Sequence, residues 1–178
     1  MAPGAPIRSD SPRKAHAYRQ YAYPLLFLIL TAAHSGEVRG ATWDEFDLFG
    51  RVWNIPASRM KAKEAHRIPL SEKVLNLLKW LKQHQLHETL VFPSPREKVL
   101  NDMTLTAFLR RVKAQSDTPD RVATAHGFRS SFRDRASEHG YARDLAERAL
   151  AHIVKNQVEA AYGSMGAARL LHLICSHQ

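Results

Sequence analysis

Residues 23–40 read YPLLFLILTAAHSGEVRG, and this stretch decides how the chain folds. It is apolar on nearly all sides from Leu25 to Leu30, which is typical of a helix buried in a protein core. Pro24 suits the first turn of such a helix, and the two glycines favour a break and then a stop. We therefore predict a core helix over residues 23–39. The run is too interrupted for a membrane span, so we expect no membrane partner.

Three short stretches after this helix have the pattern of β-strands. Trp43–Leu48 and Arg51–Ile55 flank Phe49-Gly50, which predicts a hairpin turn. A third strand is predicted at His66–Leu70, where alternate residues share one face, and Pro69 favours a position at the sheet edge. The sequence thus predicts a small three-stranded antiparallel sheet.

The rest of the chain is predicted to be mostly helical, so the expected fold class is α+β and mostly α. We expect a flexible lead-in over residues 1–15, then one domain over residues 16–178 with a tail from about residue 164. One helix is expected after Ser71, and its apolar face comprises Val74, Leu77, Leu78 and Leu81. A second is expected after Asn101 or Asp102, with an apolar face of Leu105, Phe108, Leu109 and Val112. Four more are expected over His126–His139, 142–150, 156–163 and 167–175.

Charge points to a polyanionic partner. The chain of 178 residues carries 26 Lys and Arg against 17 Asp and Glu, a formal net charge of +9. Nucleic acid is the leading candidate for a domain this basic, and a generally basic solubilising surface is the alternative. A single Cys175 excludes an intramolecular disulfide framework and a Cys-rich zinc module, and it favours a reducing cytoplasm. We expect neither a metal nor an organic cofactor.

The segment TAHGFR, residues 124–129, carries a candidate site for a phosphate. His126 and Arg129 are three residues apart, so a helix places both on one face near its N-terminus. Free backbone N–H groups there favour an anion, Arg supplies a bidentate charge, and His can transfer a proton. The alternative is a histidine at a helix start beside a solvated arginine.

Two further segments and one loop add candidate residues. His152 ends the segment Leu-Ala-His, and Tyr162 follows a pair of alanines. A lone histidine or tyrosine in such a setting is more often structural. The basic loop before the third strand carries Arg59, Lys61 and Lys63. Such a loop is normally a solvated turn, but a lysine at a hairpin tip can also enter a DNA groove.

Taken together, these pieces resemble the catalytic domain of the tyrosine recombinase (phage integrase) family, closest to integrases of prophages and genomic islands. The matching segments keep the family order from about residue 23 to 163. They are TAAHSGEVRGATW at 31–43, IPASRMK at 55–61, HGFR at 126–129, LAH at 150–152 and AAY at 160–162.

The resemblance implies a cytoplasmic bacterial or phage-derived enzyme for DNA integration and recombination, with double-stranded DNA as its partner. By position, Tyr162 would attack a DNA phosphate and form a 3′-phosphotyrosyl link, and Lys61 would protonate the departing 5′-hydroxyl. Arg129 would stabilise the charge on the phosphate, His126 would assist proton transfer, and His152 would hydrogen-bond the phosphate. DNA contacts are expected from Arg59, Lys61, Lys63 and Arg129. The resemblance further implies a tetramer on DNA and a monomer without it.

One position departs from the family. His34 stands where the family has its first catalytic arginine, and a histidine cannot form a guanidinium fork. Loss of one such donor typically costs about 10²–10³ in rate. An impaired integrase remnant that only binds DNA is therefore one alternative. A second alternative, of a different class, is a metal-free phosphodiesterase that uses His126 and His152 as acid and base.

Overall fold

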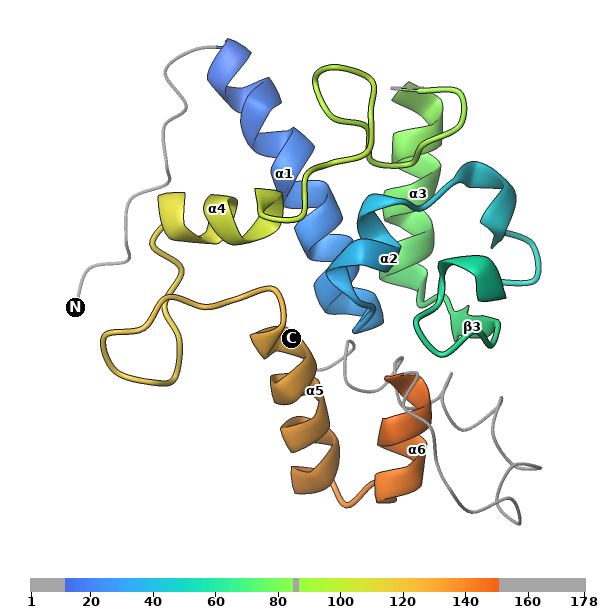
Figure 1. Cartoon of the computed structure of the whole chain (residues 1–178), viewed down its shortest axis with the longest axis vertical. Helices are drawn as coiled ribbons and strands as arrows, with labels where there is room; N and C mark the ends of the chain where they lie inside the picture. Colours follow the sequence, from blue (N-terminus) through green and yellow to red (C-terminus); the bar gives the residue numbers. More distant parts are fainter. Residues whose placement is uncertain (1–11, 85–86, 151–178) are drawn as a thin grey trace.

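The computed structural model describes residues 12–84 and 87–150, and Figure 1 shows their arrangement. Helices and a small sheet follow one another along the chain in the α+β order expected. The helices are α1 (Pro12–Thr31), α2 (Ser35–Arg39), α3 (Glu72–His84), α4 (Thr104–Arg111), α5 (Gly127–Glu138) and α6 (Arg143–Ala149). The strands are β1 (Phe46–Asp47), β2 (Val52–Ile55) and β3 (His66–Pro69), and the single-turn 3₁₀ helices are η1 (Trp43–Glu45) and η2 (Ala57–Arg59).

The first core helix differs from the one predicted. The single helix expected over residues 23–39 is two helices, and α1 begins at Pro12, so Pro24 lies inside it rather than in its first turn. The break falls at Ala32, whose φ of 51° is left-handed, and not at a glycine. L-residues adopt this conformation at a cost, so contacts from elsewhere must hold it. Gly40 does end α2, as expected.

The three-stranded antiparallel sheet is confirmed, in the order β1-β2-β3. β2 is central, and its Ile55 pairs with His66 while its Val52 pairs with Pro69. β3 is an edge strand, as Pro69 indicates. β1 is shorter than predicted because Trp43–Glu45 forms a turn of 3₁₀ helix before it.

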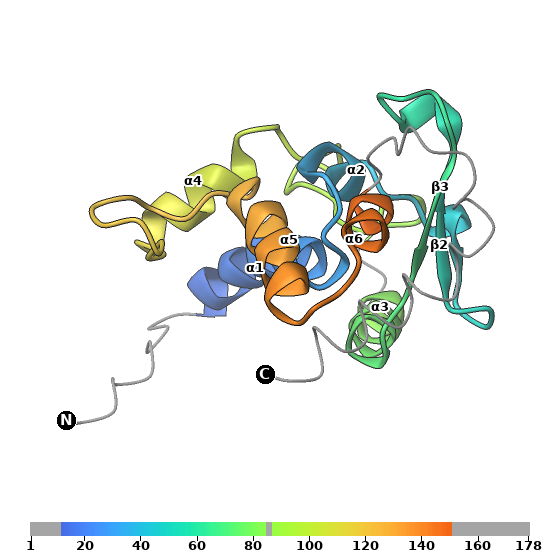
Figure 2. The same cartoon turned by 90° about the horizontal axis from the view of Figure 1, so that it is seen from below.

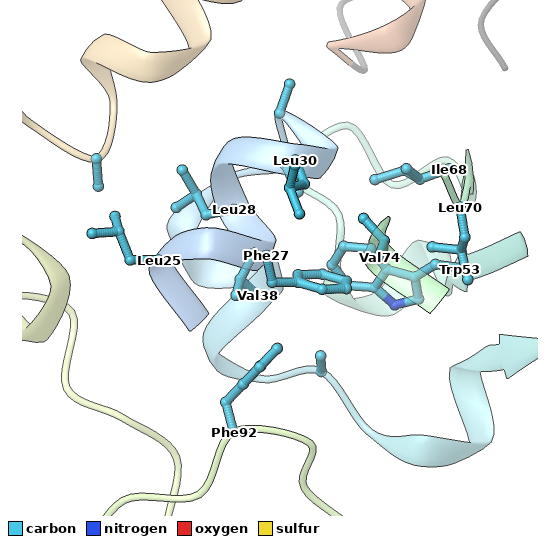
Figure 3. Packing of buried hydrophobic residues seen from close by; sticks show 14 of the residues in the cluster. Leu25, Phe27, Leu28, Leu30, Val38, Trp53, Ile68, Leu70, Val74 and Phe92 are labelled. Atoms are coloured by element: carbon cyan, nitrogen blue, oxygen red, sulfur yellow. The ribbon is translucent and has the colours of Figure 1, made fainter. Parts of the chain in front are cut away.

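Phe27 of α1 lies at the centre of the core. Its ring centroid is 5.2 Å from that of Trp53 on β2 and 5.2 Å from that of Phe92, and all three side chains are buried. Figure 3 shows Phe27 and Trp53 packed between Val38 of α2 and Val74 of α3. The apolar stretch over residues 25–30 therefore packs α1 against the sheet, α2 and α3.

The helices that follow the sheet are confirmed where the structure describes them. The Val74 amide and Ser71 Oγ lie 3.5 Å apart at the start of α3, and the Asn101 side chain accepts from the Met103 amide at 2.9 Å just before α4. The helices predicted over residues 156–163 and 167–175 lie outside the described residues.

The last two described helices, α5 and α6, lie side by side in both views, and Figure 1 shows them at one end of the described part (Figures 1 and 2). A short turn joins them, and Gly140 takes a φ of +72° there, which glycine adopts without a steric penalty. In Figure 2, α6 lies between α5 and the edge of the sheet. This placement brings the end of α6 toward the break between α1 and α2.

Candidate active site

Arg129 lies in the first turn of α5, and its side chain is buried with an exposed fraction of 5%. At the start of this helix, Thr124 Oγ1 accepts a hydrogen bond from the Gly127 amide at 3.0 Å and so satisfies an amide that has no partner within the helix. A Cβ atom at Gly127 would lie 3.1 Å from that hydroxyl, so a glycine suits the position. The TAHGFR segment therefore forms a helix start, as predicted from the sequence.

The guanidinium of Arg129 connects two distant parts of the chain. Its Nη1 donates to the carbonyl of Ala32, at the break after α1, and its Nη2 donates to the carbonyl of Leu150 at 2.5 Å. The break between α1 and α2 and the end of α6 are thus held by one side chain. Two fixed acceptors also fix the plane of the guanidinium, which preorganises its charge.

Carboxylates surround this buried cation. Burial lowers the pKa of Arg129, and the negative charges of Glu37 and Glu147 act in the opposite direction. Arginine stays protonated in proteins, so the site holds a permanent positive charge in a poorly hydrated place. A charge of this kind is suited to stabilise a phosphate whose negative charge increases during reaction.

His34 lies at the start of α2, and its charge and that of Arg129 both act on His66. His34 is the N-cap residue, and its amide donates to Glu37 Oε2 at 2.8 Å. Glu37 is buried, and its charge acts on both Arg129 and His66. His34, which the resemblance would align with an arginine, therefore shares with Arg129 its connection to Glu37 and His66.

His66, the first residue of β3, was not among the residues expected to be functional. Burial lowers the pKa of its imidazole. The charge of Glu37 and a hydrogen bond to the Ala149 backbone raise that pKa, whereas Arg129 and His34 lower it further. His66 shares the inward face of β3 with the buried Ile68, while Arg67 between them is exposed. A histidine on the apolar face of a strand was the signal in the sequence.

The basic loop before β3 keeps two of its three cations in solvent. Lys61 and Lys63 are exposed, and Met60 before them is buried with an exposed fraction of 6%. Lys63 has a φ of 58° at the turn. The loop therefore has an apolar anchor at one end and a solvent-exposed lysine directly after it.

Arg59 lies differently from the other two cations. Its guanidinium bridges the buried carboxylate of Glu45 and the carbonyl of Glu37. Glu45 also accepts a hydrogen bond from Trp53 Nε1 at 2.9 Å. This differs from the DNA-facing position expected from the sequence, because a local view of the loop does not reveal an acidic partner on η1.

Of the six residues expected to act in catalysis, the structure brings His34 and Arg129 into one cluster with Glu37 and His66. His126 is exposed at the N-terminus of α5, and Lys61 is exposed in its loop. His152 and Tyr162 lie outside the described residues.

Within residues 12–84 and 87–150, no group of three or more His, Cys, Asp or Glu side chains is arranged to hold a metal ion. No helix in that part of the chain has the length and apolar character needed to cross a membrane.

The fold has clear counterparts among solved structures. The crystal structure of XerA recombinase matches with a TM-score of 0.64 at 15% identity, over 99% of this chain and 67% of that one. The Tn1549 transposon integrase in complex with a circular intermediate DNA matches with a TM-score of 0.61 at 13% identity, over 85% of this chain and 59% of that one. The chain thus has the fold of a tyrosine recombinase catalytic domain, as expected from the sequence.

Sequence comparison defines the family. Residues 7–166 match the model of the phage integrase family, so the chain belongs to this family. It is 37% identical over 149 residues to the integrase of Enterobacteria phage P4, which covers 75% of this chain and 33% of that protein. It is 34% identical over 165 residues to prophage integrase IntA of Escherichia coli, and this match covers 88% of this chain and 39% of that protein. The chain thus spans between a third and two fifths of the length of these relatives.

Proposed function

We propose that this chain is the catalytic domain of a site-specific DNA recombinase, which cuts and rejoins double-stranded DNA through a 3′-phosphotyrosyl intermediate. The single observation that carries the proposal is Arg129. Its guanidinium is buried, permanently charged and held in orientation by two backbone carbonyls. A fixed cation of this kind, in a chain with a net charge of +9, is suited to bind a DNA phosphate.

In the proposed reaction the phenol oxygen of Tyr162 attacks phosphorus, and the bond from phosphorus to the 5′-oxygen breaks. Arg129 stabilises the charge that develops on the non-bridging oxygens. His126 assists removal of the phenol proton, Lys61 protonates the departing 5′-oxygen, and His152 hydrogen-bonds the phosphate. The covalent link retains the phosphodiester bond energy, so rejoining needs neither ATP nor a metal.

The placement of Lys61 supports its part in this reaction. It lies in an exposed loop beside a buried methionine, so it can reach a DNA groove while the base of the loop stays fixed. Lys63 lies in the same exposed loop and is proposed as a second DNA contact. Arg59 is left out of this set because Glu45 and Glu37 engage its guanidinium.

His34 supports a second candidate, an impaired integrase that binds DNA and cleaves it slowly. At the family's arginine position it offers at most one ring N–H to the phosphate, against the two parallel donors of an arginine. Its place in the Arg129 cluster means that the substitution affects the site directly.

We further propose that the chain acts as a tetramer on DNA and as a monomer without it. Its place of action would be the cytoplasm of a bacterium, where the proposed substrate lies.

Covalent capture on a nicked suicide DNA tests the proposal. After cleavage, the short fragment that carries the released 5′-hydroxyl dissociates, so the strand cannot be rejoined. An active protein therefore accumulates as a covalent complex that migrates slowly and survives SDS. The proposal predicts such a complex for the wild-type protein and none for Tyr162→Phe with equal DNA binding. Cleavage that survives Tyr162→Phe would instead support the phosphodiesterase that uses His126 and His152.

A further inference from the structure

Arg59 lies two residues before Lys61, and its guanidinium is held from two directions. Its Nη1 donates to the carboxylate of Glu45 on η1, and its Nη2 donates to the carbonyl of Glu37 on α2. The Glu45 carboxylate is itself fixed, because it is buried and accepts a hydrogen bond from Trp53 Nε1 at 2.9 Å. We call these contacts the Arg59 anchor. It joins the last residue of η2 to η1, to α2 and, through Trp53, to the central strand of the sheet.

The end of α2 leaves room for this anchor. The Glu37 carbonyl is one of the last four of the helix, and such carbonyls lack amide partners within it. Gly40 ends the helix, and a Cβ atom there would lie 2.9 Å from Arg59 Nη2. A larger residue at this position would therefore displace the guanidinium. The glycine that ends α2 thus also allows Arg59 to reach the carbonyl.

The anchor sets the point at which the chain enters the exposed loop. The Arg59 amide donates to the Pro56 carbonyl at 3.0 Å, and the Lys63 amide donates to the Met60 carbonyl at 3.1 Å. Met60 is buried, whereas all five residues from 61 to 65 are exposed. Figure 2 shows η2 and this turn at one end of the sheet. Lys61 is therefore the first exposed residue after a segment that the anchor and Met60 hold in place.

We propose that Arg59 is a positioning residue for the general acid: through Glu45 and Glu37 it fixes the base of the loop from which Lys61 reaches the departing 5′-oxygen. This inference rests on the proposed function for the role of Lys61, and on the structure for the anchor. Arg59 itself does not touch DNA. It acts through the loop, because a general acid must lie within hydrogen-bond reach of the atom that it protonates.

A DNA with sulfur at the leaving position separates this role from a purely structural one. In this suicide substrate a sulfur atom replaces the bridging 5′-oxygen of the scissile phosphate. A thiolate leaves without a proton, because a thiol is far more acidic than an alcohol. Cleavage of the sulfur substrate therefore does not need Lys61. The measurement is the ratio of the capture rates on the two substrates at saturating DNA, which a change in the folded fraction does not alter.

Arg59→Lys keeps the charge but loses the planar fork that reaches two acceptors. We expect its capture rate on ordinary DNA to fall about tenfold, a part of the factor of about 10²–10⁴ that a positioned general acid contributes. On the sulfur substrate its rate should stay close to that of the wild type. Lys61→Met should show the same pattern with a larger loss, whereas Arg129→Lys should be slow on both substrates.

Arg51→Lys is the matched control. The Arg51 guanidinium also pairs with a carboxylate, that of Glu72 at 3.2 Å, but both side chains are exposed and neither contacts the loop base in this pair. Exposed pairs of this kind contribute little. We therefore expect both capture rates of Arg51→Lys to equal those of the wild type.

Glu45→Gln tests the anchor without removing a cation from the chain. A neutral amide holds the Arg59 guanidinium less strongly than a carboxylate does. We expect a smaller loss than for Arg59→Lys on ordinary DNA, and a rate close to that of the wild type on the sulfur substrate. This variant carries the test if Arg59→Lys does not fold.

The two substrates distinguish the possible failures. Equal slowing of Arg59→Lys on both substrates, or no slowing on either, would overturn the positioning role while the proposed function stands. A Lys61→Met protein that sulfur does not restore would contradict Lys61 as the general acid, and with it the positioning of that acid. A wild-type protein that captures neither substrate would contradict the proposed function and the positioning role together.

Discussion

Removal of Arg59 should destabilise the fold far more than removal of an exposed cation. Arg59→Met leaves the buried carboxylate of Glu45 with Trp53 Nε1, at 2.9 Å, as its remaining donor among the described contacts. The side chain of Glu45 is 5% exposed and that of Arg59 is 22% exposed. Loss of one partner from a buried pair costs about 3–5 kcal/mol. Because water reaches part of Arg59, we expect about 3 kcal/mol, at the lower end of that range.

Urea unfolding followed by tryptophan fluorescence measures this free energy, and Trp53 lies in the network itself. At about 2–4 °C per kcal/mol for a chain of this size, the melting temperature should fall by about 6–12 °C. Adding Glu45→Gln should recover part of the loss, since a neutral amide is less costly to bury than an unpaired charge.

Arg51→Met is the matched control for this experiment. The Arg51–Glu72 pair is 3.2 Å long with side chains 63% and 53% exposed, and exposed pairs contribute at most about 1 kcal/mol. A cost for Arg59→Met as small as that for Arg51→Met would refute the reasoning. It would mean that Glu45 is hydrated in solution.

Three further expectations concern DNA binding, catalysis and pH. Affinity for duplex DNA should fall steeply with salt, and Lys63→Met should reduce the salt slope by about 1, whereas Arg59→Met should leave it unchanged in filter binding; equal slopes for both variants would contradict the assignment of these two cations. His34→Arg should raise the rate of covalent capture with little change in affinity, because the added donor contributes most in the transition state; no gain with DNA binding preserved would place the defect elsewhere. Burial holds the pKa of His66 in the folded state below its unfolded value of about 6.5. At pH values between these two pKa values, the unfolded state therefore binds more protons than the folded state. Stability should therefore be full above about pH 6.5 and fall below it, and His66→Gln should flatten this dependence in unfolding curves measured from pH 7.5 to 5.5; an unchanged slope would exclude His66 as its source.

Much of the fold could be predicted because its signals are local. The strands, the Ser71 cap and the edge position of β3 follow from residue types close together in the sequence. The break after α1 could not be predicted in this way. Ala32 is a good helix former, and its left-handed conformation is accompanied by a hydrogen bond from Arg129, 97 residues away in the chain.

The same distinction between local and distant contacts applies to the site. HGFR predicts a helix start with an arginine in its first turn, and the structure agrees. Arg59 looks like another cation of a basic loop until Glu45, 14 residues earlier, is seen beside it. In the sequence His66 looks like an ordinary strand residue, since the groups that act on its imidazole belong to three other elements, α2, α5 and α6. A histidine on the apolar face of a strand is the feature that should prompt a search for such partners.

Peptide mapping of the captured complex tests the central claim most directly. The wild-type protein is trapped on suicide DNA, digested with trypsin and nuclease, and analysed by mass spectrometry. We expect a nucleotide joined through its 3′-phosphate to Tyr162, and we expect no such peptide from the Tyr162→Phe protein. A covalent link at any other residue, or cleaved DNA with no link to protein while binding is intact, would contradict it.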